Sequence, residues 1–237
     1  MTHPTFPDYP EDSRDKALEV LKSIAKVSSG AVPVVGPFFS EAIELLYKIP
    51  LDKRRQDWFD QLVDAIRELT TKVDNLEKLS KNEEFITTLH RATDLALRTH
   101  QREKRTLLRN AVVSAGSPAA PELDKQTFFL RLIDELSVIQ ILVLLLYQEP
   151  TAWFKKRGIK PIDYSSAGAI EAFNQAYPKL AKDPYVKELV FTELERRGLL
   201  HNVSVMVTLS SVYNPRTTKL GIEFLDYVSA QSIEPQQ

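Results

Sequence analysis

The sequence predicts a mainly α-helical protein: an N-terminal helical bundle with a long antiparallel helical hairpin, followed by a small α+β module. Apolar residues recur at helical spacing through most of the 237 residues. Fourteen prolines against seven glycines are typical of helices separated by proline stops. Residues 203–209 alternate with period two and are rich in valine, which predicts one strand.

The composition is that of an ordinary globular protein, with 43% apolar residues, 27% charged residues and a net charge of −1. This net charge gives no overall attraction to nucleic acid or acidic lipid, but it is compatible with a local basic patch. The chain has no cysteine, which excludes disulfides, thiolate metal ligands and cysteine nucleophiles. Residues 1–10 do not resemble a signal peptide, and the apolar run 138–147 is too short to span a bilayer. We therefore expect a cytoplasmic protein.

The N-terminal part predicts two helices around an unusual apolar turn. Residues 12–27 form the first helix, and the prolines within 30–39 forbid a continuous helix there. A second helix follows and stops before Pro50. Glycine and proline between two apolar helices also occur in pore-forming bundles. One hypothesis is therefore a membrane-active effector that uses residues 30–48. Three charged side chains favour a buried turn instead: Glu41, Glu44 and Lys48.

Residues 52–116 predict the hairpin, as two long helices with one break at residues 80–82. Asn82, followed by two glutamates, fits the rules for a helix start. The first helix carries apolar residues at the spacing of packed helices: Trp58, Leu62, Ile66, Leu69, Val73 and Leu76. The second helix carries Phe85, Leu89, Ala92, Ala96, Leu107 and Ala111.

The two hairpin helices also carry complementary charged stripes. The acidic stripe on the first helix comprises Asp57, Asp60, Asp64 and Glu68. The basic stripe on the second comprises Arg98, Arg102, Arg105 and Arg109. Such stripes either pair across the hairpin or contact another molecule, which can be a second copy of the chain. They contribute little to stability, and their main effect is on the register of the two helices and the choice of partner. The basic stripe is therefore a candidate partner-contact surface.

A proline-containing linker after Gly116 places a domain boundary between residues 1–116 and 117–237. The pattern beyond it predicts a buried central helix over 126–148, a loop over 153–163, helices over 167–181 and 184–197, the strand over 203–209 and a last helix capped by Thr217 or Thr218.

This order of elements resembles a winged-helix module with an extra C-terminal helix. Residues 194–200, Leu-Glu-Arg-Arg-Gly-Leu-Leu, and 218–225, Thr-Lys-Leu-Gly-Ile-Glu-Phe-Leu, are similar to the endings of many bacterial winged-helix proteins. Winged helices often bind DNA, so the resemblance implies candidate nucleic-acid or anion contacts at Lys187, Arg196, Arg197, Arg216 and Lys219. Three glutamates on the candidate recognition helix over 184–197 would repel the phosphates of nucleic acid. A winged helix that contacts a protein therefore explains this mixture of charges better.

The middle of the chain also resembles a group of uncharacterised bacterial helical proteins. The residues that carry this resemblance are 82–85, Asn-Glu-Glu-Phe, and 104–112, Lys-Arg-Thr-Leu-Leu-Arg-Asn-Ala-Val. The resemblance implies a cytoplasmic bacterial protein and brings no activity with it.

The chain shows no phosphate-binding glycine loop, dinucleotide fingerprint or nucleophile elbow. No histidine is paired at helical spacing with another histidine, so we predict no metal site, no cofactor and no catalytic residues. The four are His3, His90, His100 and His201. An enzyme whose catalytic residues are scattered along the chain would leave no such pattern.

We therefore expect a non-enzymatic interaction or regulatory protein that self-associates through the hairpin. Its partner would be a protein or a second copy, with no small-molecule substrate evident and a membrane disfavoured. A DNA-binding transcriptional regulator using the winged helix is the alternative, and the membrane-active effector is another.

Overall fold

The computed structural model describes residues 53–72, 78–79, 81–161, 167–201, 206–207 and 212–229. This part is mainly helical, as the sequence predicts. Its helices of more than one turn are α3 (Lys53–Lys72), α5 (Glu83–Arg98), α6 (Arg102–Gly116), α7 (Leu123–Glu135), α8 (Val138–Gln148), α9 (Pro150–Lys156), α10 (Ile170–Ala176), α11 (Pro184–Arg196) and α12 (Lys219–Tyr227).

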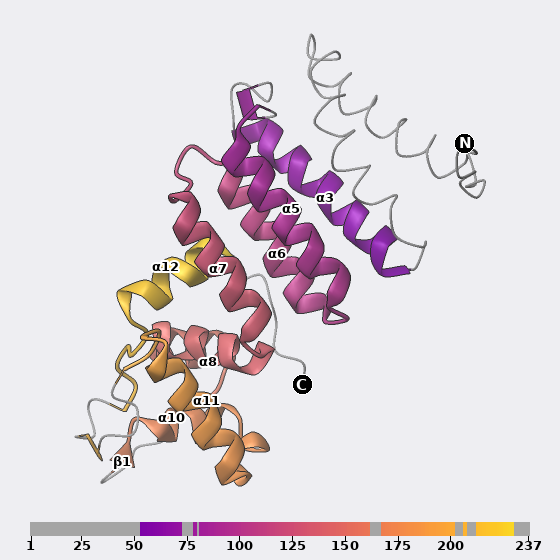
Figure 1. Ribbon diagram of the computed structural model, residues 1–237. Helices are drawn as coiled ribbons and strands as arrows, with labels where there is room; N and C mark the ends of the chain where they lie inside the picture. The colour runs from indigo at the N-terminus through magenta and orange to yellow at the C-terminus, as the bar shows by residue number, and fades with distance from the viewer. Residues whose placement is uncertain are drawn as a thin grey trace, which may run out of the picture.

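Helices α3, α5 and α6 lie side by side in the N-terminal half (Figure 1), and α6 packs against both others. The predicted apolar positions of these helices form their shared core. The buried ones are Trp58, Leu62, Ile66, Leu69, Phe85, Leu89, Ala92, Ala96, Leu107 and Ala111. Asn82 caps α5 as predicted, because its side chain accepts hydrogen bonds from the backbone N–H groups of Glu84 and Phe85. Val73 and Leu76 lie outside the described residues.

The predicted long antiparallel hairpin is wrong in its second helix. In the structure that helix is two helices, α5 and α6. The backbone becomes extended at Thr99 and Gln101, and α6 then folds back along α5. In a continuous helix, Ala96 and Leu107 would lie about three turns apart on one face. Their spacing therefore gave no indication of the break between α5 and α6. Folding back lets Leu107 reach the core while Arg98, His100 and Arg102 at the break stay exposed.

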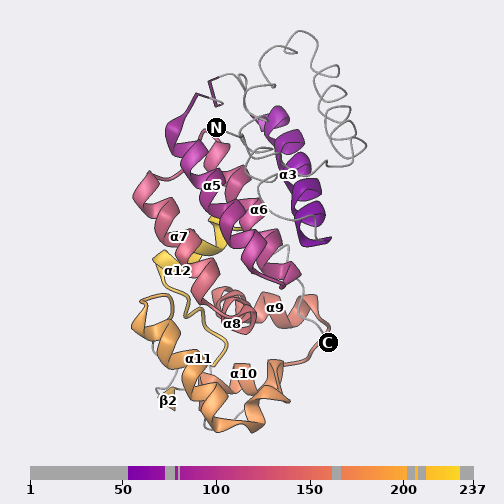
Figure 2. The ribbon, with the colours of Figure 1, turned by 45° about the vertical axis from the view of Figure 1, so that its right-hand side comes forward.

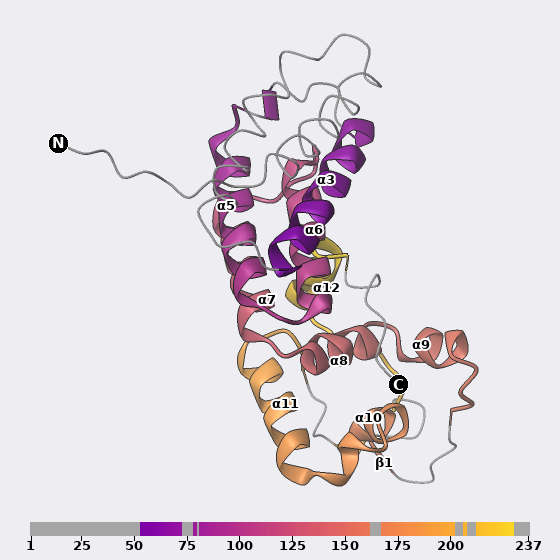
Figure 3. The ribbon, with the colours of Figure 1, turned by 90° about the vertical axis from the view of Figure 1, so that its right-hand side faces the viewer.

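The predicted central helix over 126–148 is also two helices, α7 and α8. Ser137 starts α8 with a capping box: its Oγ accepts from the Gln140 backbone N–H at 3.3 Å, and Gln140 Oε1 accepts from the Ser137 backbone N–H at 2.8 Å. This break turns α8 across the molecule, between the N-terminal helices and the group formed by α10 and α11 (Figure 3). Helix α8 is buried on most sides, as predicted for the central helix.

The segment after α8 is more helical than predicted. Pro150 occupies the first turn of α9, which extends into the loop predicted over 153–163, and Trp153 and Phe154 are buried in this helix. The single helix predicted over 167–181 is instead α10 and a short 3-10 turn, Leu180–Lys182. Helix α11 follows as predicted, and Gly198 ends it with a left-handed φ of 69°.

The described β-structure is small. Strand β1 (Ala167–Gly168) pairs antiparallel with β2 (Met206–Val207), which lies inside the predicted strand, and Leu200 forms an isolated bridge with Thr217. The sheet of a winged-helix module is therefore not shown by the described residues. Thr218 caps α12, whereas the hydroxyl of buried Thr217 donates to the Leu144 carbonyl at 2.8 Å.

One continuous hydrophobic core joins α3 to α12. The Phe129 ring on α7 lies 5.7 Å from the Phe224 ring and 5.3 Å from the Tyr227 ring, both on α12. Asn110 on α6 donates to the Val228 carbonyl at 3.0 Å. Helix α7, which follows the proposed boundary at residue 116, packs on α5 and α6. The division into 1–116 and 117–237 stays a prediction.

The N-terminal predictions lie outside the described residues: the helix over 12–27, the turn over 30–39 and the membrane-active segment over 30–48. Each described helix falls short of the length or the apolar character needed to cross a bilayer.

Candidate functional site

The charged stripes pair with each other inside one chain. Asp57 on α3 lies 3.6 Å from Arg105 on α6, and Glu68 lies 2.5 Å from Arg109. The Arg105 side chain is only 7% exposed and also donates to the Thr99 carbonyl at 3.3 Å. Arg105 and Arg109 are therefore used within the bundle, which is one of the two uses that the sequence left open.

The other two members of the basic stripe flank the break between α5 and α6. Arg98 ends α5 and Arg102 begins α6, and both side chains are exposed. The four arginines therefore do not form the single helical stripe that the sequence predicts.

Glu68 is the most heavily paired member of the acidic stripe. Lys72 and Arg109 each lie 2.5 Å from one of its carboxylate oxygens. The hydrogen bond from Lys72 is the largest cause and lowers the pKa of Glu68 below its usual range. Burial, the second-largest cause, opposes this, and the hydrogen bond from Arg109 lowers the pKa further.

This pairing predicts a pH-dependent contribution to stability. Because the Glu68 pKa is lower in the folded chain, its contribution is present above the unfolded pKa of about 4.5 and is lost as the pH falls through the folded pKa. The change Glu68→Gln should cost about 0.5–1 kcal/mol at neutral pH, since the pair is partly exposed and screened by solvent.

Urea unfolding of both chains from neutral pH to about pH 3 measures this difference. The gap between the two chains should close as the pH falls. A gap that stays constant over this range would contradict the assignment to Glu68.

The candidate nucleic-acid contacts come together only in part. Thr218 Oγ1 donates to the Gly198 carbonyl at 2.7 Å, and the His201 N–H donates to the Arg216 carbonyl at 3.1 Å. These bonds bring the segments that carry Arg216 and Lys219 to the C-terminal end of α11. Lys187 lies near the other end of α11, in its first turn.

The two neighbouring arginines among the candidate nucleic-acid contacts, Arg196 and Arg197, form ion pairs with carboxylates. Glu193 lies 2.9 Å from Arg196 and 2.5 Å from Arg197, and Arg197 also lies 2.5 Å from Glu135 on α7. The two arginines lower the pKa of Glu193, with the hydrogen bond from Arg197 as the largest cause. Such pairing leaves little positive charge here for phosphate.

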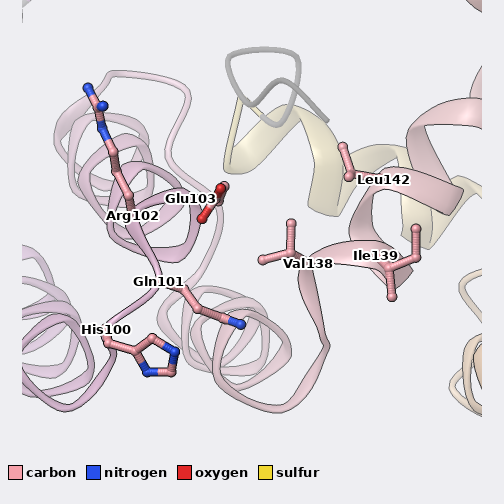
Figure 4. A pocket seen from close by; sticks show the side chains of 7 residues that line it. All are labelled: His100, Gln101, Arg102, Glu103, Val138, Ile139 and Leu142. Atoms are coloured by element: carbon pink, nitrogen blue, oxygen red, sulfur yellow. The ribbon is translucent and has the colours of Figure 1, made fainter. Parts of the chain in front are cut away.

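A surface hollow of about 520 Å³ lies where the α5–α6 connection faces the start of α8. One wall is aliphatic and comes from α8, and Figure 4 shows Glu103 directed toward it while Arg102 points away. The full lining is His100, Gln101, Arg102, Glu103, Val138, Ile139 and Leu142. Among these lining residues no nucleophilic side chain contacts an acid or a base. The lining therefore gives no recognisable catalytic arrangement.

The histidines are spread over the molecule. His90 is half-buried on α5, whereas His100 and His201 are exposed. In the ranges that the structure describes, no three histidine, aspartate or glutamate side chains gather closely enough to hold a metal ion. His3 lies outside those ranges.

Two surface features were missed at the sequence level. The first is an apolar pair on the outer face of α11, Tyr185 and Leu189, which are 82% and 67% exposed. The signal was an α11 sequence with apolar residues on more faces than one core contact can cover: Tyr185, Val186, Leu189, Val190, Phe191 and Leu194.

The second is a basic cluster at the end of α9, defined as Lys155, Lys156, Arg157 and Lys160, all exposed. The Arg157 guanidinium lies over the Trp153 ring, 3.9 Å from its centre. The run Lys-Lys-Arg-Gly-Ile-Lys was visible in the sequence as part of a predicted loop.

Comparison of the chain with protein-family models, with curated proteins and with solved structures found no match.

Proposed function

We propose that this protein is a non-enzymatic interaction protein of the regulatory kind, and that it self-associates through the outer face of α11. The supporting observation is the apolar pair Tyr185 and Leu189. In the described part of the chain, these are the large hydrophobic side chains that stay exposed. They lie one turn apart on one helix face, the spacing used when helices pack. Arg105 and Arg109 of the basic stripe are less suited to this role because they pair with the acidic stripe within the chain.

The charges beside the apolar pair favour a second copy in antiparallel orientation. Glu188 is exposed near the start of α11, and the Arg196 side chain is 71% exposed near its end. With a two-fold axis between Leu189 and Thr192, Tyr185 of one copy lies opposite Arg196 of the other. Glu188 lies one turn from Tyr185 on the same face, within reach of the long Arg196 side chain. A carboxylate and an aromatic ring are both good partners for a guanidinium, and symmetry forms each contact twice.

The expected association is weak. Burying two large side chains from each copy contributes roughly 6–10 kcal/mol, and association itself costs at least about 4 kcal/mol. The remaining 2–6 kcal/mol has a midpoint near 4 kcal/mol, which corresponds to a dissociation constant of about 1 mM. A helix of 13 residues also offers a contact smaller than that of a stable dimer. A reversible contact of this kind suits regulation.

Charge reversal at the two ends of α11 tests the arrangement. Glu188→Arg alone and Arg196→Glu alone should each weaken self-association by at least about tenfold, because like charges then meet twice. A mixture of the two variants should associate about as well as the unchanged chain, since opposite charges then meet at both contacts between positions 188 and 196. Sedimentation velocity up to about 1 mM measures all four samples.

Circular dichroism melting is the control for folding, because both positions are exposed and the melting temperatures should change little. A mixture that associates no better than its components would contradict the antiparallel contact. A monomer of 27.0 kDa at every concentration would contradict self-association altogether. The cytoplasmic location, the bacterial origin and the winged-helix relation remain expectations from the sequence.

A further inference from the structure

The basic cluster at the end of α9 is a concentrated positive charge without a carboxylate partner among the described residues. Its four cations fall within residues 155–160, and no acidic residue lies between Pro150 and Pro161. All four side chains are exposed, and within the described residues no carboxylate lies at ion-pair distance from any of them. Other cations of the structure, such as Lys72, have carboxylate partners.

Complementing the α9 helix dipole does not require this much charge. The C-terminal end of a helix carries roughly half a negative charge, which one cation offsets. Four cations exceed that amount several-fold and repel one another at this spacing. The excess is useful where the cluster meets an external polyanion.

The arginine of the cluster is held in place by packing. Trp153 is 9% exposed, and its ring contacts the rings of Phe154 and Tyr177 with centroids 5.1 Å and 5.9 Å away. The Arg157 guanidinium lies over this fixed ring. A guanidinium positioned in this way presents its planar donors to a phosphate with little further loss of entropy.

We infer that this basic cluster binds the phosphate backbone of double-stranded nucleic acid without reading its sequence. Duplex phosphates recur at close spacing and match several cations within six residues. The two aromatic side chains of α9, Trp153 and Phe154, are buried, so neither is available to stack on a splayed base or to enter a lipid layer. This inference is independent of self-association through α11.

The test is fluorescence anisotropy with a labelled DNA duplex of about 24 base pairs, titrated at several salt concentrations between about 50 and 200 mM. Four phosphate contacts predict a slope of about −3.6 for the logarithm of the binding constant against the logarithm of salt. The variant Lys155→Ala, Lys156→Ala, Lys160→Ala should reduce the slope to about −0.9 and weaken binding at least tenfold at low salt. Arg157 stays unchanged because it packs on Trp153.

The matched control is the variant Lys179→Ala, Lys187→Ala, Lys219→Ala, which removes the same charge from outside the basic cluster and includes two lysines of the surface suggested by the winged-helix resemblance. It should bind DNA with the slope of the unchanged chain. An equal loss in this control, or no binding to DNA at about 50 mM salt, would overturn the proposal. So would binding to vesicles of phosphatidylserine and phosphatidylcholine without binding to DNA.

Discussion

Replacing Trp58 with alanine should lower the free energy of unfolding by about 3–5 kcal/mol, one of the largest losses expected from any single change in this chain. The Trp58 side chain is fully buried, and its Nε1–H donates to the hydroxyl of Thr93 at 3.2 Å. The change leaves a cavity between α3 and α5 and removes the partner of a hydroxyl in a residue only 2% exposed. Urea unfolding followed by circular dichroism measures the loss.

The matched control is Trp58→Phe, which keeps most of the ring volume and removes the hydrogen bond. It should cost about 1–2 kcal/mol. A loss below about 1 kcal/mol for Trp58→Ala would show that α3 is not held by this contact.

Gly221→Ala should destabilise the protein by about 2–3 kcal/mol although alanine is the better helix former. A Cβ at this position on α12 would lie 2.5 Å from the Leu199 carbonyl oxygen and 2.6 Å from the Thr217 Cγ2. The Leu199 carbonyl is fixed by the Thr218 N–H, which donates to it at 3.0 Å. The start of α12 would therefore have to move away from the end of α11.

The control on the same helix is Asp226→Ala, at an exposed position, which should change the free energy of unfolding by less than about 0.5 kcal/mol. Helix propensity alone predicts that Gly221→Ala stabilises by about 1 kcal/mol. The sign of the measured change therefore separates the two effects, and a gain would contradict the close approach of α12 to Leu199.

Helix faces were predictable from the sequence because burial imposes a period that the residues must follow. The seam from Trp58 to Leu69 and the cap at Asn82 follow this logic. The two missed breaks share a cause: no glycine or proline marks either of them, and the apolar residues on the two sides of each keep a helical spacing. The break before α8 did have a signal, because Ser137 and Gln140 have the spacing of a capping box. The break between Thr99 and Gln101 had none of this kind.

The surfaces were harder to predict than the core. Complementary charges on two neighbouring helices correctly indicated that they could pair, as Asp57 with Arg105 shows. Periodicity says which positions are apolar but not which of them lack a neighbour, so Leu189 could not be told from a core residue. The lysines at 155–160 were visible, but their lack of carboxylate partners among the described residues depends on tertiary contacts.

The outer face of α11 can be tested by cross-linking, because the chain has no native cysteine. Thr192→Cys places one thiol beside the proposed two-fold axis, on an exposed position of α11. Asp94→Cys places one on α5, in the other half of the molecule, as Figures 1 and 2 show. With a short bis-maleimide at high protein concentration, the Thr192→Cys chain should yield a covalent dimer of twice 27.0 kDa and the Asp94→Cys chain a monomer. A monomer from both chains, or equal dimer from both, would contradict the contact.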